Sequence, residues 1–257
     1  MRFRHVPARQ GARWVREGLR VFLRRPIAFC VLVLIYLFVG SLVAFVVSPL
    51  ASVGFMIATR RAQAGRFPLP DVFVEPLRTT AAQRWAQVKL GLAYAAVIIV
   101  VLWIAGGVGR AAFDALGDAL REGNKSPQEL QPLIGDAFLH LAWILGAFAL
   151  ASIPFWHAPA LVHWGRQGAA QSLFFSTVAC WRNKGAFAVY SLGWLAVLMA
   201  FSFVSAAVFA LLGMPQLAVP FTMPAALMLS SAFYASLYFT FADSFELPTD
   251  PYPLETP

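Results

Sequence analysis

The chain has 257 residues, of which 60% are hydrophobic and only 12% are charged. A typical soluble domain is about 45–50% apolar and about 25% charged. Half the usual charge cannot solvate the surface of a soluble domain of this size. Composition therefore excludes an ordinary soluble globule and favours an integral membrane protein.

Charged residues are missing from four long stretches of the chain. With His counted as neutral, no Asp, Glu, Lys or Arg occurs in 26–59, 90–109, 137–165 or 185–242. About 20 apolar residues cross the hydrocarbon core once as a helix. The second and third stretches therefore predict one crossing each, and the fourth predicts two, with the turn at Gly213-Met214-Pro215.

The first stretch has two interpretations. Its 34 residues reach about 51 Å as a helix, whereas two full crossings need about 60 Å. Ser48-Pro49 is a natural break, which predicts a full crossing over 26–47 and a short return over 50–64. The alternative is that 50–59 is a re-entrant segment, and the charges of the loops favour the two crossings.

Basic residues are distributed unevenly among the loops. Segment 1–25 holds eight Arg and one Glu, and segment 60–89 holds six basic and two acidic residues. Segment 166–184 holds three basic residues and no acid, whereas 110–136 holds three basic and five acidic residues. Six crossings with both termini in the cytoplasm place 17 of the 20 Lys and Arg inside, in line with the positive-inside rule. A re-entrant 50–59 would weaken this bias.

The expected fold is all-α: a polytopic transmembrane helix bundle with six crossings arranged as three hairpins. A short cytoplasmic interfacial helix is expected before each hairpin. One domain covers 1–242, and the acidic, Pro-rich tail 243–257 is predicted to be disordered. Small residues at four-residue spacing predict close packing in a compact bundle, among them Gly54/Ala58, Gly91/Ala95, Ala142/Gly146 and Ser202/Ala206/Ala210. The crossings are expected at about 26–47, 50–64, 90–109, 135–157, 185–212 and 216–242.

The N-terminal segment has the clearest local pattern. At 100° per residue, Arg9, Arg13, Arg16, Arg20 and Arg24 fall within an arc of about 80°. The opposite side is apolar and includes Trp14. This pattern predicts a basic amphipathic helix whose apolar face lies in lipid and whose arginines bind anionic phospholipid headgroups at the cytoplasmic interface. A topology anchor and a recruitment surface for an acidic partner or a specific anionic lipid both remain open, and the apolar face disfavours nucleic acid.

Few residues within the membrane could perform chemistry. Asp136 and His140 lie one turn apart on the fourth crossing and could relay a proton or bind a cation. Tyr234 and Tyr238 on the sixth crossing could line a solute path. A solvated helix start and helix-to-helix hydrogen bonds are the alternative interpretations. The spacing of the four His argues against a shared metal or haem, so we expect no metal, no cofactor and no catalytic residues.

Several local motifs lie near the N-terminus and at the end of the second predicted crossing: Pro7-Ala8-Arg9-Gln10-Gly11, Trp14-Val15-Arg16, Gly18-Leu19, Phe22, Gly54-Phe55-Met56 and Gly65-Arg66-Phe67-Pro68. These motifs resemble those of a family of bacterial integral inner-membrane proteins of unknown function. The segment with Ser172 and Arg182-Asn183 has a looser likeness to six-helix bacterial proteins that include membrane domains attached to glycerophosphodiester phosphodiesterases. The resemblance implies a six-helix inner-membrane bundle without an established activity.

The favoured function is a non-catalytic organiser or accessory protein of the inner membrane that binds partner proteins or anionic lipid. Missing catalytic groups and the basic interfacial helices support it. The alternative is a transporter or permease for a small solute or lipid, supported by the repeated hairpins and by Pro215, Pro220 and Pro224 at the start of the last crossing.

Overall fold

The computed structural model describes residues 3–123 and 125–246. These residues are almost entirely helical, apart from a single antiparallel bridge that pairs Phe3 with Phe245. The helices are α1 (Gln10–Arg24), α2 (Pro26–Gln63), α3 (Ala81–Glu122), α4 (Pro127–Ser152), α5 (Ala158–His163), α6 (Ala169–Arg182), α7 (Lys184–Leu211) and α8 (Ala218–Ser244), with 3₁₀ turns η1 (Pro70–Phe73), η2 (Glu75–Leu77), η3 (Ile153–Phe155) and η4 (Pro215–Leu217).

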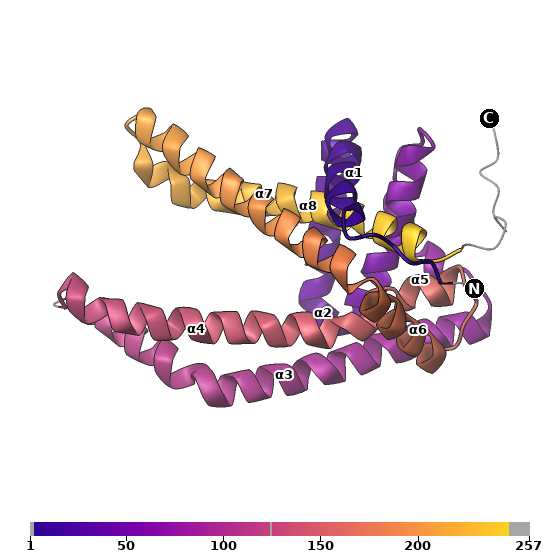
Figure 1. Cartoon of the computed structure of the whole chain (residues 1–257), viewed down its shortest axis with the longest axis horizontal. Helices are drawn as coiled ribbons and strands as arrows, with labels where there is room; N and C mark the ends of the chain where they lie inside the picture. The colour runs from indigo at the N-terminus through magenta and orange to yellow at the C-terminus, as the bar shows by residue number, and fades with distance from the viewer. Residues whose placement is uncertain (1–2, 124, 247–257) are drawn as a thin grey trace.

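Two long helical arms project from a common base (Figure 1). One arm is the pair α3 and α4, and the other is the pair α7 and α8. The base contains α1, α2, α5, α6 and the adjoining ends of the arms, and it holds the main hydrophobic core. The predicted compact bundle is therefore wrong for the arms, since Gly146 on α4 and Ala206 on α7 are exposed, whereas Gly54 and Gly91 do make close contacts in the base.

Four stretches of the described residues are long and apolar enough to cross a bilayer. They are Ala81–Gly107, Pro127–His163, Lys184–Leu211 and Pro220–Ser244. They make up most of the two arms, and the second and fourth also reach into the base. A fifth would arise only if α1 and Pro26–Phe38, which meet at a bend of 100°, counted as one span. The arrangement is that of a polytopic all-α membrane protein, and the six-crossing arrangement is not confirmed.

Helix α2 folds back on itself. A straight helix would separate Tyr36 from Phe55 by about 28 Å, yet their ring centroids are 6.2 Å apart. The hydroxyl groups of Tyr36 and Ser48 are 3.0 Å apart, so the reversal lies between these two residues. The expected break at Ser48-Pro49 is not observed, because Pro49 lies inside the helix.

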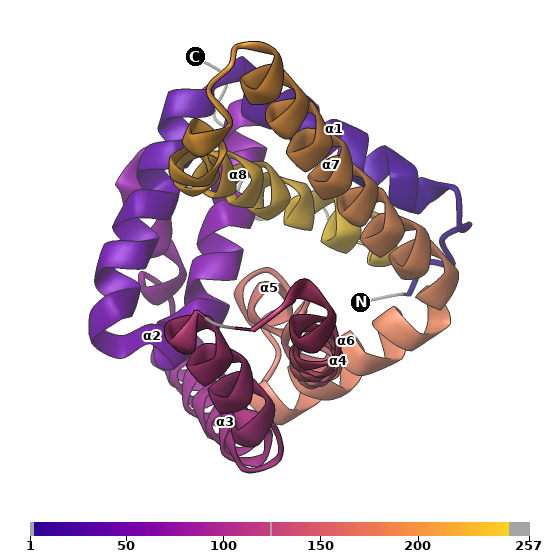
Figure 2. The ribbon, with the colours of Figure 1, turned by 90° about the vertical axis from the view of Figure 1, so that its left-hand side faces the viewer.

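The two ends of α2 meet at the base. Arg25, directly before α2, donates a hydrogen bond of 2.6 Å to the carbonyl oxygen of Gly65, directly after it. The Arg25 guanidinium also lies over the ring of Phe67. The two halves of α2, before and after the reversal, both run across the long direction of α3, α4, α7 and α8 (Figure 2). The chain thus enters and leaves α2 at neighbouring points of the structure.

The loop after α2 is fixed by an ion-pair cluster. Arg61 makes hydrogen bonds of 2.7 and 3.0 Å with both carboxylate oxygens of Asp71, and it also pairs with Glu75. The hydrogen bond from Arg61 holds the pKa of Asp71 below its usual value. The short cytoplasmic helix expected before the second hairpin is not a separate element. Glu75–Leu77 forms a 3₁₀ turn, and α3 begins at Ala81, with Thr80 as its N-cap.

The far ends of the arms follow local sequence signals. Helix α3 continues unbroken to Glu122 and ends at Gly123, whose φ of +65° is unfavourable for residues with a Cβ. Ser126 donates its backbone N–H to the Glu129 carboxylate at 2.8 Å at the start of α4, as the capping-box pattern predicts. Pro215 begins the 3₁₀ turn η4, whereas Pro220 and Pro224 lie within α8.

Helix α8 extends beyond the predicted crossing. It continues to Ser244, and Phe245 is fully packed in the core. The first residues of the predicted disordered tail are therefore ordered. The rest of that tail, 247–257, lies outside the described residues.

Candidate functional site

Helix α1 is packed against protein along its apolar face. Its buried residues are Gly11, Trp14, Val15, Gly18, Val21 and Phe22, and they face α7 and α8. A Cβ on Gly11 would lie 2.6 Å from the backbone nitrogen of Tyr190 in α7, and a Cβ on Gly18 would lie 2.9 Å from the Cα of Ser236 in α8. The absence of a side chain at both positions lets the backbones approach this closely.

Polar contacts fix the position of α1. The carboxylate of Asp243, near the end of α8, accepts hydrogen bonds from Gln10 Nε2 at 2.6 Å and from Trp14 Nε1 at 2.7 Å. The Trp14 ring also packs on Phe187 and Tyr190 of α7. Trp14 is only 1% exposed, so its predicted role as a lipid-facing interface residue is wrong.

Asn183 joins three distant segments at the base. Its Oδ1 accepts a hydrogen bond of 3.0 Å from the backbone N–H of Val6, and its Nδ2 donates to the Arg4 carbonyl oxygen and to Ser244 Oγ, each at 3.3 Å. The N-terminal segment, the junction of α6 and α7, and the end of α8 are therefore held together at one point.

The arginine face of α1 points away from the protein. Arg9, Arg13, Arg16, Arg20 and Arg24 are all exposed, as the periodicity predicts. Glu17 is the acidic residue among them, and it accepts two hydrogen bonds from Arg20, at 2.7 and 2.8 Å. What differs from the sequence-based expectation is the opposite face, because protein rather than lipid covers it.

A groove runs between the flank of α1 and α7. Its volume is about 680 Å³. Three of the exposed arginines, Arg16, Arg20 and Arg24, line it together with one glycine of α7, Gly193. The other lining residues are apolar and come from α1: Ala12, Val15, Leu19 and Leu23.

The structure does not unite the predicted intramembrane polar residues. Asp136 is exposed on α4, and the ring of His140 packs edge-on against Phe113 of α3 at 6.3 Å. Within the described part of the chain, these two residues share no hydrogen bond or ion pair. Tyr234 and Tyr238 lie in α8 near the base and belong to different surroundings from each other.

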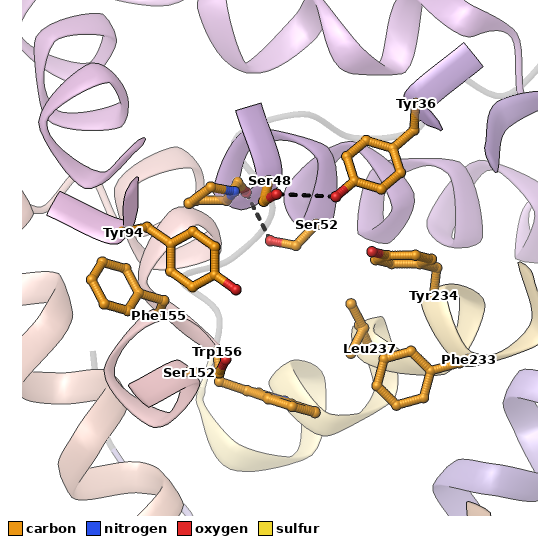
Figure 3. Close-up of a pocket in the computed structure, with 11 residues that line it drawn as sticks. Tyr36, Ser48, Ser52, Tyr94, Ser152, Phe155, Trp156, Phe233, Tyr234 and Leu237 are labelled. Atoms are coloured by element: carbon orange, nitrogen blue, oxygen red, sulfur yellow. Dashed lines mark hydrogen bonds between the residues drawn. The ribbon is translucent and has the colours of Figure 1, made fainter. Parts of the chain in front are cut away.

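A small cavity opens at the base, where the arms diverge (Figure 3). Its volume is about 170 Å³, and Tyr36, Tyr94 and Tyr234 direct their hydroxyl groups into it. Tyr234 stacks on Phe55 with a centroid distance of 4.4 Å, whereas Tyr238 packs on Trp164 instead. The remaining lining residues are Ser48, Pro49, Ser52, Ser152, Phe155, Trp156, Phe233 and Leu237.

Two serines that line the cavity lie shortly before a proline. Ser48 directly precedes Pro49 in α2, at the end of the reversal, and Ser152 ends α4 just before the 3₁₀ turn that contains Pro154. From the sequence, Ser48-Pro49 was interpreted only as a break between two crossings, and Ser152 with Pro154 was missed. A serine shortly before a proline inside an apolar stretch is the signal that would have identified both.

Buried histidines do not form a metal site. His157 is 0% exposed, lies among the rings of Phe187, Phe241 and Phe245, and donates its backbone N–H to Ser176 Oγ. No cluster of three or more His, Cys, Asp or Glu occurs in 3–123 and 125–246.

The chain is 32% identical over 268 residues to a probable inner membrane protein of Burkholderia thailandensis. The alignment covers 95% of this chain and 94% of that protein. No protein-family model and no solved structure match the chain. The relative supports the resemblance to bacterial inner-membrane proteins, and the comparisons give no support to the looser likeness to membrane domains of glycerophosphodiester phosphodiesterases.

Proposed function

We propose that this chain, which belongs to the family of bacterial inner-membrane proteins represented by its Burkholderia thailandensis relative, is a non-catalytic organiser of the inner membrane. In this proposal the protein collects anionic phospholipid headgroups at the cytoplasmic face and presents them, with its own arginines, to partner membrane proteins. No residue is assigned a catalytic role.

One observation carries the proposal: α1 is held by protein and exposes a row of five arginines. An amphipathic helix that is not bound to protein would have to insert its apolar face into lipid. Here Gly11, Gly18 and the Trp14–Asp243 hydrogen bond already position the helix. The arginines are therefore preorganised, and each contributes about 1 kcal/mol near an anionic leaflet.

The proposed orientation places the base, with both termini, in the cytoplasm. Segments 1–25, 60–89 and 166–184, which hold 17 of the 20 Lys and Arg, adjoin the base. The acid-rich segment 110–136 lies around the far end of the α3–α4 arm. This distribution fits the positive-inside rule with four crossings, made by α3, α4, α7 and α8, and with α2 as a hairpin whose ends meet.

Replacing all five arginines of α1 by glutamine is expected to weaken binding to vesicles or lipid discs that contain anionic phospholipid by at least a hundredfold, because the Coulomb attraction is removed. Glutamine keeps the helix propensity, so the melting temperature should stay close to that of the wild type. The measurement is exchange of fluorescent anionic lipid from purified protein. Equal affinity of the two proteins for anionic lipid would refute the proposal.

A transporter is the second candidate, and the cavity in Figure 3 favours it. Its aromatic and hydroxyl lining lies beside the reversal of α2 and the end of α4, and transporters form substrate sites where helices are interrupted. If this candidate holds, Tyr36→Phe with Tyr234→Phe abolishes flux of a solute in reconstituted vesicles. Phe138→Tyr, on the exposed surface of α4, serves as the control that leaves flux unchanged.

A further inference from the structure

The groove between α1 and α7 combines two kinds of surface. Its floor is apolar and is formed by Ala12, Val15, Leu19 and Leu23 of α1 beside Gly193 of α7. Leu23 is 69% exposed, whereas Trp14, Val21 and Phe22 of the same helix are buried. A soluble anion needs no such floor, whereas a phospholipid brings an acyl chain that would cover it.

The rim of the same groove is cationic. Arg16, Arg20 and Arg24 are spaced by four residues, so they form one row along the edge of α1. Glu17 neutralises part of this charge through its hydrogen bonds to Arg20 and its ion pair with Arg16 at 3.8 Å. Three guanidinium groups against one carboxylate leave a net positive rim, and guanidinium groups bind phosphate with paired hydrogen bonds.

The length of the row distinguishes one class of lipid from another. Arg16 and Arg24 are eight residues apart, which is about 12 Å along a helix. A single phosphodiester carries one negative charge, which leaves part of the net positive charge of this row uncompensated. Two phosphates joined through one glycerol, as in cardiolipin, can engage both ends together.

Helix α7 continues the apolar surface beyond the groove. It leads from Gly193 into a long arm, and only 6% of the most hydrophobic stretch of Lys184–Leu211 is buried within the protein. Acyl chains that start at the groove can therefore lie along α7 without displacing any part of the protein.

We propose that this groove is a specific site for one cardiolipin molecule, with its two phosphates on Arg16, Arg20 and Arg24 and an acyl chain on the floor. This site rests on the proposed binding of anionic lipid by α1 and assigns that binding to one place and one class of lipid. Arg9 and Arg13 belong to the same exposed face but do not line the groove.

The test compares two double variants of the full-length protein in detergent. Arg16→Gln with Arg24→Gln removes two charges from the groove, and Arg9→Gln with Arg13→Gln removes two charges from the same helix outside it. Native mass spectrometry then measures the binding of cardiolipin, phosphatidylglycerol and phosphatidylcholine. The groove variant should bind cardiolipin about tenfold or more weakly than wild type, and the control variant less than threefold.

A third variant tests the floor without changing charge. Ala12→Phe adds an aromatic ring to the groove from an exposed position, so it should also weaken cardiolipin binding while the melting temperature is kept.

The outcomes separate this inference from the broader proposal. Equal losses in the two double variants, or equal affinity of wild type for phosphatidylglycerol and cardiolipin, would overturn the groove site and leave general binding of anionic lipid intact. Equal affinity of wild type for phosphatidylcholine and both anionic lipids would overturn the proposed function as well.

Discussion

Gly11→Ala and Gly18→Ala are each expected to lower the stability of the protein by about 3 kcal/mol or more and to release α1 from the base. A Cβ at either position would overlap backbone or Cβ atoms of Ala186, Tyr190 or Ser236, and these atoms cannot move without shifting α7 or α8. Overpacking of this kind is relieved only by moving a helix. The tightest contact between α1 and the arms would therefore be lost.

Limited trypsin digestion in detergent measures this release, because α1 carries many arginines. The two variants should be cut within 1–25 much faster than the wild type, and their melting temperatures should fall. Gly106→Ala is the matched control: Gly106 also lies in a helix, but a Cβ there meets nothing within 4 Å. Unchanged digestion of the Gly11 and Gly18 variants would show that α1 lies on lipid and is not docked on protein.

The docking of α1 also shows what hydrophobic periodicity cannot determine. The pattern of arginines and apolar residues correctly predicted the helix and its two faces. It could not tell whether lipid or protein covers the apolar face, since both are apolar surroundings. Gly11 and Gly18 on that face were the available clue, because glycine adds no burial in lipid but permits close contact between helices. The partner Asp243 lies more than 200 residues away, and no local pattern indicates it.

Helix α2 illustrates a second limit. A charge-free stretch of 34 residues allows two short crossings, one bent hairpin or a partial re-entry, and its composition is the same in each case. The choice depends on long-range contacts such as that between Arg25 and Gly65. Signals confined to a few residues were more reliable: the Ser126–Glu129 cap and the 3₁₀ turn at Pro215 both appear in the structure.

The candidate sites divide in the same way. The exposure of the α1 arginines follows from helix geometry alone and was predicted. Grouping Asp136 and His140 with Tyr234 and Tyr238 required the relative placement of two arms, which one sequence does not determine. The cavity lies between elements distant in sequence, so only its individual residues carried signals. The groove is lined by α1 and, from α7, by Gly193.

The proposed function depends on the base facing the cytoplasm with both ends of α2 in it. Single cysteines in place of Ala64, just after α2, and of Glu122, at the far end of α3, report these two sides, because both positions are exposed. Cys30 and Cys180 are first replaced by Ala, so that no native thiol competes. Arg9→Cys adds a report from α1 itself.

Labelling intact cells with a maleimide that passes the outer membrane but not the inner one is the most direct measurement. The cysteine at position 122 should react fully in intact cells, and those at positions 9 and 64 should react only after the inner membrane is permeabilised. Labelling of position 64 in intact cells while position 9 stays protected would place the ends of α2 on opposite sides of the membrane. Labelling of both positions would place the arginine face outside the cytoplasm, and either result would contradict the proposed function.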